Sequence, residues 1–305
     1  LCKYTNLYMI LSFFKFTKLP QLILAIIISL IIMAVIKNQN LTYNDFFSTI
    51  TLILIFLLSI FIISKNSILK SNQFITLGLI IFSGTFIKMS YDFKITLSYL
   101  FLLLSIRKIY SLRSKKSLNK KFFDIGFWFS VSIFFHTINI FFFISILAGT
   151  VIFYKLDIKS LFKIIVGFIT ALSLPLTYLL FDGKIDLNLN LFIINAEIIW
   201  NNLTTNKILL YSDFNHWFFG VAVALIFTLY SLKFFGHNLT DKLKNLFLFI
   251  FFLNSLAFIF LIKEYSILLF FPFLVTLVKI ISILRNNLLF EIAILTIILL
   301  NSYPF

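Results

Sequence analysis

Long apolar stretches, separated by short polar segments, constrain this chain more than any other feature of its sequence. Eleven such windows lie at about residues 19–36, 46–64, 72–88, 93–108, 122–136, 138–154, 161–181, 217–235, 245–262, 265–283 and 288–303. Crossing the hydrocarbon core of a bilayer, which is roughly 30 Å thick, takes about 20 helical residues. Segments in lipid must satisfy their own backbone hydrogen bonds, which favours helices. The sequence therefore predicts an all-α, polytopic integral membrane protein with about eleven transmembrane helices, in one domain spanning 1–305.

The composition excludes an ordinary water-soluble domain. The chain is 61% hydrophobic and 12% charged, whereas soluble domains average about 25% charged residues. A net charge of +15 would suggest nucleic acid as the partner of a soluble protein. In a membrane protein such residues anchor cytoplasmic loops against anionic lipid, so we expect the bilayer, and no nucleic acid, as the partner. The single cysteine, Cys2, excludes an internal disulfide framework.

The basic residues alternate between loops and so predict an orientation. With the N-terminus in the cytoplasm, 20 of the 26 lysines and arginines fall in inner segments, seven of them between Arg107 and Lys121. Seven of the 11 acidic residues fall outside. Cytoplasmic loops of membrane proteins carry an excess of Lys and Arg, so this arrangement is the expected one. The window at 19–36 lacks a small-residue cleavage site after it, which predicts an anchor and not a removed signal peptide.

This orientation leaves one larger extracytoplasmic loop, at 182–216. The loop is polar and rich in Asn, and its LFIINAEIIW segment at 191–200 could form a helix lying on the membrane surface. Long loops on a helical scaffold often carry function. An unstructured connector is the alternative.

His136 is the first candidate for a chemical role. It lies in SIFFHTINIFFF, at the predicted outer end of the span at 122–136. Ionisable groups at membrane depth are costly and are by default functional candidates. A histidine at a helix end can also simply hydrogen-bond a terminal carbonyl, so both roles stay open.

A second group of candidates precedes the span at 93–108. Lys88, Asp92 and Lys94 lie there beside Tyr91, and two cations around one carboxylate can bind a phosphate while keeping the acid ionised. The alternative is an ordinary interfacial loop whose lysines extend to the headgroups.

Two further outer segments combine charged and aromatic residues. Asp213, His216 and Trp217 close the long loop where the chain re-enters the membrane. Such residues suit sugar binding, because aromatic faces stack on pyranose rings, and they suit interface anchoring equally well. Lys263 and Tyr265 flank Glu264 in a tight outer turn, which could be a solvated hairpin tip or could point into a cavity.

Several signals of metal or nucleotide chemistry are absent from the sequence. We find no Walker A loop, HExxH, CxxC or GxSxG pattern and no Asp-x-Asp pair. The sequence therefore predicts neither a metal nor a cofactor.

The stretch 91–153 resembles a family. A polar outer segment, a short apolar span, a basic inner loop and then SVSIFFHTINIFFFISIL are similar to the EpsG/Wzy group of bacterial oligosaccharide repeat-unit polymerases. Members often show Phe-His and a small polar residue between two apolar spans, here Phe135-His136-Thr137. The likeness covers about 60 residues; elsewhere only the number of spans and the single large loop match.

The resemblance implies an enzyme of the bacterial inner membrane that makes O-antigen, capsule or exopolysaccharide. Its substrate would be an undecaprenyl-pyrophosphate-linked oligosaccharide, its partners a flippase and a chain-length regulator, and it would need no cofactor. Lys94 and Lys263 would bind the pyrophosphate, and His136, or else Asp92 or Asp213, would be the base. The family commonly uses outer arginines for the pyrophosphate, whereas the three arginines here, Arg107, Arg113 and Arg285, are predicted to be inside.

Other functions fit parts of the sequence. A glycosyltransferase that uses a polyprenyl-phosphate sugar would place an acidic base in the first outer loop, where Asp45 is the only acid. A flippase for the lipid-linked oligosaccharide would need charges inside several spans and usually a longer chain with two related halves. A structural membrane subunit is the remaining alternative.

Overall fold

The computed structural model describes residues 19–36, 43–69, 75–76, 80, 92–154, 157–181, 239–259 and 267–284. Within these residues every secondary-structure element is helical and no strand occurs. The predicted all-α class is therefore confirmed for this part of the chain. Two helices, Tyr43–Lys65 and Phe93–Ser114, are long and apolar enough to cross a membrane.

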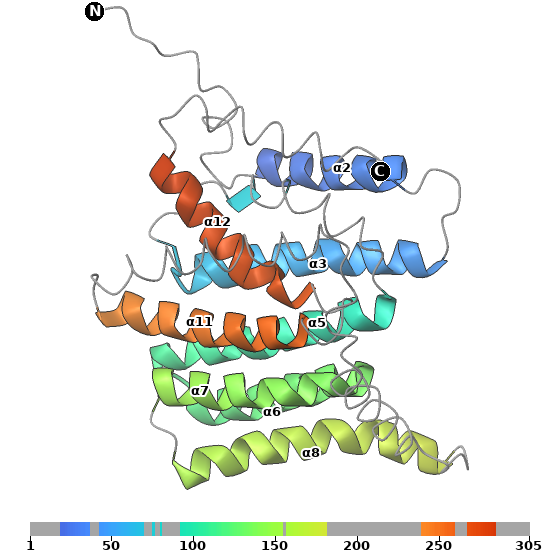
Figure 1. Ribbon diagram of the computed structural model, residues 1–305. Coiled ribbons are helices and arrows are strands. Elements are labelled where there is room, and N and C mark those ends of the chain that lie inside the picture. The colour runs from blue at the N-terminus through green and yellow to red at the C-terminus, as the bar shows by residue number, and fades with distance from the viewer. Residues whose placement is uncertain are drawn as a thin grey trace, which may run out of the picture. The chain divides into compact units, whose positions relative to one another are not determined.

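The helices coincide with the predicted apolar windows where the structure describes them. They are α2 (Leu19–Ile36), α3 (Tyr43–Lys65), α5 (Phe93–Ser111), η1 (Leu112–Ser114), α6 (Leu118–Phe135), η2 (Thr137–Phe142), α7 (Phe143–Phe153), α8 (Ile158–Phe181), α11 (Leu239–Ile259) and α12 (Phe270–Leu284). Figure 1 labels the α-helices among them. The windows at 217–235 and 288–303, most of 72–88, and the loop at 182–216 lie outside the described residues.

Most helices begin or end a few residues away from their apolar windows, and two of these differences have a clear cause. Helix α6 begins at Leu118 and so includes Lys120 and Lys121, because lysine is a good helix former although it is not apolar. The window at 138–154 opens with the 3₁₀ helix η2 before α7 begins at Phe143. Hydropathy alone cannot separate these two helix types.

The chain forms two compact units, which we describe separately: residues 1–93 with 270–305, and residues 94–269. In the first unit the start of α3 meets Phe93, whose backbone amide donates to Asn44 Oδ1 at 3.0 Å. The Phe47 and Phe93 rings lie 5.7 Å apart, and Phe56 stacks on Phe270 at 4.9 Å.

Between Asp45 and Ile63, helix α3 buries all its polar side chains, while every exposed side chain is large and apolar. The buried face includes Asp45, Ser48, Thr49, Thr51 and Ser59 beside aliphatic residues. The exposed large hydrophobic side chains are Tyr43, Phe46, Phe47, Ile50, Leu54, Leu57 and Phe61. All four buried hydroxyls donate to carbonyls of their own helix, such as Thr49 Oγ1 to the Asp45 carbonyl at 2.7 Å. This distribution is the reverse of that on an amphipathic helix in water.

In the second unit α5 and α6 form an antiparallel hairpin. Ser98 Oγ lies 3.1 Å from the Ser132 carbonyl, and Ser105 Oγ lies 3.1 Å from the Ile125 carbonyl. At the turn, Lys108 Nζ pairs with Asp124 Oδ2 at 2.5 Å. These contacts set the register of the two helices along their whole length.

Glycines allow α8 to pack directly on the backbone of α6. A Cβ at Gly126 would lie 1.9 Å from the Ile164 carbonyl oxygen, and one at Gly167 would lie 2.2 Å from the Phe123 carbonyl oxygen. The two helices therefore approach too closely for any larger residue at either position. Small residues have this role in helix packing within membranes, where apolar burial supplies little driving force.

On the other side of the unit α7 packs against α11. Asn254 Nδ2 donates to Ser145 Oγ at 2.9 Å, and the Phe142 and Phe251 rings lie 5.4 Å apart. Gly149 of α7 lies against Phe247 and Ile109.

Candidate functional site

Three buried polar side chains join α5, α6 and η2. Asn139 Nδ2 donates to Ser98 Oγ and to Ser132 Oγ, the latter at 2.6 Å. All three residues are almost fully buried. We call them the Ser98–Ser132–Asn139 cluster. Buried polar groups are costly unless hydrogen-bonded, and here each one supplies a partner for the others.

The cluster holds the segment that carries His136. His136 ends α6 in an extended conformation, with φ −150° and ψ 106°. Its backbone amide donates to the Ser132 carbonyl at 3.1 Å, and its carbonyl accepts from the Asn139 amide at 3.1 Å. The imidazole is half-buried. The backbone on both sides of His136 is thus tied to residues of the cluster.

Lys94 lies at the same end of the hairpin as His136. Ser98 of α5 contacts Ser132 of α6, Lys94 lies one turn before Ser98, and His136 lies one turn after Ser132. Because the helices are antiparallel, the turn from Ser98 to Lys94 and the turn from Ser132 to His136 both run about 5.4 Å toward the same end of the hairpin. Lys94 is exposed. The structure therefore brings these two predicted site residues to one level of one hairpin.

Asp92 belongs to the first unit. It is exposed and directly precedes α5. Within this unit the Phe93 amide donates to Asn44 Oδ1, so Asp92 and Asp45 each adjoin one residue of this contact. Asp45 is buried, and it was predicted to serve as a base only in the alternative glycosyltransferase.

The other predicted site residues cannot be compared with the geometry. Lys88, Asp213, His216, Trp217, Lys263 and Tyr265 lie outside the described residues. Their roles stay predictions, as do those of His136, Asp92 and Lys94.

The Ser98–Ser132–Asn139 cluster was not predicted from the sequence. The signal that could have identified it is Asn139, which interrupts a long aromatic run two residues after Thr137. An amide in such a run needs buried partners, but only the packing of α5 on α6 shows which serines supply them.

The opposite end of the second unit is strongly basic. Of the twelve lysines and arginines described in this unit, eleven lie at the end formed by the close of α5 and the starts of α6, α8 and α11; Lys94 is the other. Lys163 Nζ of α8 donates to Asn119 Oδ1 of α6 at 2.8 Å, which joins two of these starts. We call this region the basic end.

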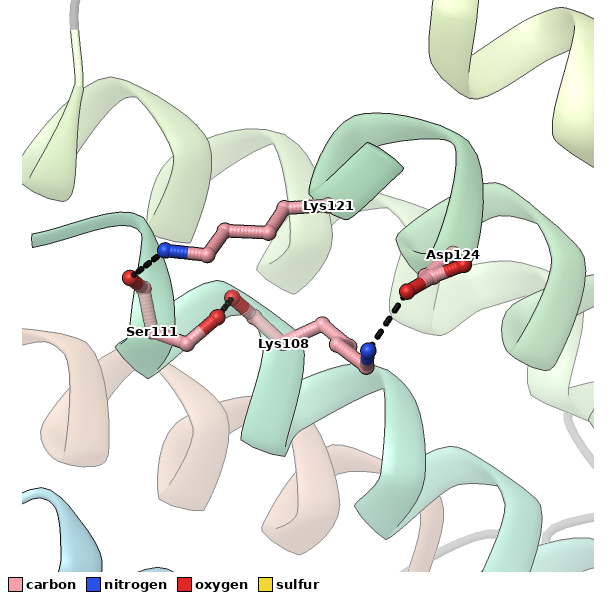
Figure 2. Close-up of polar contacts among 4 residues, drawn as sticks. All are labelled: Lys108, Ser111, Lys121 and Asp124. Atoms are coloured by element: carbon pink, nitrogen blue, oxygen red, sulfur yellow. Dashed lines mark hydrogen bonds and ion pairs between the residues drawn. The ribbon is translucent and has the colours of Figure 1, made fainter. Parts of the chain in front are cut away.

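Two lysines at the basic end are buried. Lys121 Nζ donates to the Ser111 carbonyl and to Ser114 Oγ, both at 2.5 Å, and Figure 2 shows its ammonium at the last turn of α5 beside the Lys108–Asp124 pair. Cations are favourable at the carbonyl end of a helix. Burial, followed by repulsion from Lys108, lowers the pKa of Lys121.

Lys244 of α11 is the second buried lysine, and it pairs with Asp241 at 3.4 Å. Burial lowers the pKa of its ammonium, repulsion from Arg113 adds to this effect, and Asp241 opposes it. The contact of the Tyr110 and Phe247 rings at 5.1 Å places Arg113, one turn after Tyr110, near the start of α11.

Within the described residues, no group of three or more His, Cys, Asp or Glu side chains is arranged to hold a metal ion. The comparisons with known proteins found no family model, no curated protein and no solved structure that matches the chain.

Proposed function

We propose that the chain is a multi-pass protein of the bacterial inner membrane, with about eleven spans, a cytoplasmic N-terminus and the outer loop at 182–216. Two observations support this. Between Asp45 and Ile63 the exposed side chains of α3 are all large and apolar, while the polar side chains are buried. The second unit also gathers eleven of its twelve described cations at one end, as the excess of basic residues in cytoplasmic loops requires. The end that carries Lys94 and His136 would then face outward.

We further propose that the protein polymerises undecaprenyl-pyrophosphate-linked oligosaccharide repeat units at the outer face of this membrane. The observation that carries this proposal is the register of α5 and α6, which brings Lys94 and His136 to one end of one hairpin. A cation and an imidazole at one level are the two groups that this transfer needs: one for the leaving pyrophosphate and one for the proton.

In the proposed reaction an acceptor hydroxyl attacks the anomeric carbon of the lipid-linked glycan. A new C–O bond forms, the C–O bond to the pyrophosphate breaks, and undecaprenyl pyrophosphate leaves with the bonding electrons. His136 takes the hydroxyl proton, with Asp92 or Asp213 as the alternative base. Lys94 and Lys263 offset the charge of the leaving group, and Lys88 supports them. His216, Trp217 and Tyr265 bind the sugars.

The test is the length of the polysaccharide in a strain carrying His136→Ala. We expect long chains to disappear while single repeat units remain attached to their carrier, with normal amounts of the protein in the membrane. His237→Ala is the matched control, because no role is assigned to that histidine, and it should leave the ladder intact. Unchanged long chains in His136→Ala would exclude this role for His136, and complete loss of surface glycan would favour export instead.

A second candidate function rests on Asp45. This carboxylate is buried at the start of α3, next to the contact between Asn44 and Phe93, and a base at that position suits a transferase that uses a polyprenyl-phosphate sugar. If this function is correct, Asp45→Asn abolishes the addition of single sugars and leaves chain length unaffected, whereas His136→Ala has little effect.

A further inference from the structure

Three aromatic rings stack along one face of the hairpin formed by α5 and α6. The Phe101 ring of α5 stacks on the Trp128 ring of α6 at 5.7 Å and on the Phe135 ring of α6 at 5.5 Å, with interplanar angles of 8° and 10°. All three side chains are half-buried. We call these three residues the Phe101 stack. One ring from α5 thus lies between two rings from α6, on a face that is partly accessible.

The Phe101 stack runs along the hairpin and turns its ring edges outward. Trp128 and Phe135 are seven residues, or about 10.5 Å, apart along α6, which matches the two ring separations placed end to end. Rings stacked in this direction cover each other's faces, so mainly their edges stay accessible. The edge of an aromatic ring carries partial positive charge, and its face carries partial negative charge.

A cation lies on the same face at the proposed outer end. Lys94, Phe101 and Lys108 follow each other at intervals of seven residues, which places them on one side of α5. Lys108 pairs with Asp124 of α6 (Figure 2). Lys94 is exposed, and among the described residues no ion pair joins it to an acid. The face therefore has an uncompensated cation at one end, aromatic rings in its middle and a neutralised ion pair at the other end.

A ligand that fits this face has an anionic head and an apolar chain that carries many double bonds. The anion would pair with Lys94, and the chain would run from there along the rings into the membrane. The π face of a carbon–carbon double bond is negative and so suits a positive ring edge. A polyprenyl chain has such a bond in every isoprene unit, whereas a phospholipid acyl chain has few or none. These bonds also leave fewer torsions to be ordered when the chain binds.

We propose that the Phe101 stack binds the polyprenyl chain of the lipid carrier, whose phosphate pairs with Lys94. The proposal rests on the proposed function for the identity of the substrate, and it adds the residues that hold the chain. His136 directly follows Phe135 in the sequence, so a chain held on the stack keeps the carrier's phosphate at the end of the hairpin that carries His136. Phe101, Trp128 and Phe135 are thus positioning residues.

The test measures lipid phosphates retained by the full-length protein purified in detergent. Native mass spectrometry would compare geranylgeranyl phosphate with hexadecyl phosphate, which has the same phosphate and a main chain of the same length without double bonds. We expect the wild-type protein to retain geranylgeranyl phosphate preferentially. Phe101→Leu/Trp128→Leu keeps an apolar surface but removes two rings. It should reduce this preference about threefold to tenfold, because ring contacts contribute energy beyond the burial of apolar area.

Two further variants separate the contribution of the rings from other effects. Lys94→Gln should weaken the retention of both phosphates equally, because it removes the cation and leaves the rings. Phe162→Leu removes a ring that is 61% exposed on α8 and should keep the preference of the wild type. If the double variant is not monodisperse, the single variants Phe101→Leu and Trp128→Leu replace it.

Equal retention of the two phosphates by the wild type would overturn the proposal, as would an unchanged preference after the rings are removed. An equal loss of preference in Phe162→Leu would also overturn it, because the stack would then have no special role. These measurements involve no polysaccharide. A failed retention test therefore leaves the polymerase proposal to the chain length in His136→Ala, and unchanged chains in that strain leave the retention result intact.

Discussion

Lys244 is a buried cation whose surroundings disfavour its charge. Because its pKa is lowered on folding, the unfolded chain binds more protons between the lowered pKa and the ordinary value of about 10.5. Stability therefore rises with pH across that interval, and the full cost of the charge is present below it. The charged groups that act on Lys244 are Arg113, which adds to the cost, and Asp241, which reduces it.

We predict that Lys244→Met stabilises the protein by about 1 kcal/mol at pH 7.5, because burial and repulsion from Arg113 outweigh the attraction of Asp241 for this ammonium. Asp241 is 29% exposed, so water solvates its carboxylate once the partner is removed. The gain should shrink as the pH approaches 10.5. Thermal unfolding in detergent, followed by tryptophan fluorescence at several pH values, measures both effects. Lys242→Met, at an exposed position on the same helix, is the control and should show no such pH dependence. A loss of stability in Lys244→Met at pH 7.5 would contradict the prediction.

Asn139 gives a second prediction at the scale of single residues. Asn139→Leu deprives Ser98 and Ser132 of a buried hydrogen-bond partner. We expect the free energy of unfolding to fall by about 1–2 kcal/mol, because a typical hydrogen bond contributes about 1 kcal/mol and one between membrane helices about 0.6 kcal/mol. The midpoint of thermal unfolding measures the loss. The triple variant Ser98→Ala/Ser132→Ala/Asn139→Leu removes all three polar groups and should recover part of it. No recovery would mean that shape, and not hydrogen bonding, is what Asn139 supplies.

At the scale of elements, the contact of α6 with α8 depends on two glycines. Gly126→Ala would place a methyl group against the Ile164 carbonyl and the Phe168 amide, which cannot move without separating the helices. We expect a destabilisation at the upper end of the 1–3 kcal/mol that is typical of overpacking. The midpoint of thermal unfolding measures this loss, and Gly167→Ala should lower it by a similar amount.

Gly149→Ala is the matched control for this prediction. Its methyl group would meet the side chains of Phe247 and Ile109, which can shift by small rotations. We therefore expect a smaller loss than in Gly126→Ala. Equal losses would indicate that helix separation is not the cause.

At the scale of the whole molecule, the proposed orientation in the membrane rests on the basic end of the second unit, as the described residues show it. In a Cys2→Ser background, Lys94→Cys should react in intact cells with a maleimide that cannot cross the membrane, because this residue is exposed at the proposed outer end. Lys115→Cys, exposed in the turn after α5, should react only after the cells are opened. Mass spectrometry of the purified protein detects the label. Labelling of Lys115→Cys in intact cells would contradict the proposed orientation and with it the proposal of an outer site at Lys94 and His136.

The helices of this protein could be predicted almost entirely from local properties. The apolar windows predicted the bounds of α2 and the central residues of α3, α5 and α8. An apolar segment of this length has few alternatives to a helix. Helix ends were less certain: Lys120 and Lys121 are helical although polar, and η2 is a 3₁₀ helix within an apolar run. The eleven-span count and the role of the loop at 182–216 stay predictions.

The sequence by itself determined that the described chain is helical and that its basic residues concentrate after the span at 93–108, since both depend on residue type and spacing. Only the tertiary structure decided which residues meet. Ser98, Ser132 and Asn139 are up to 41 residues apart and join because α5 and α6 are antiparallel and in one register. The same register puts Lys94 level with His136, and the contact of Tyr110 with Phe247 puts Arg113 beside α11. No local pattern contains such pairings, because they arise from side chains fitting between helices that are distant in sequence.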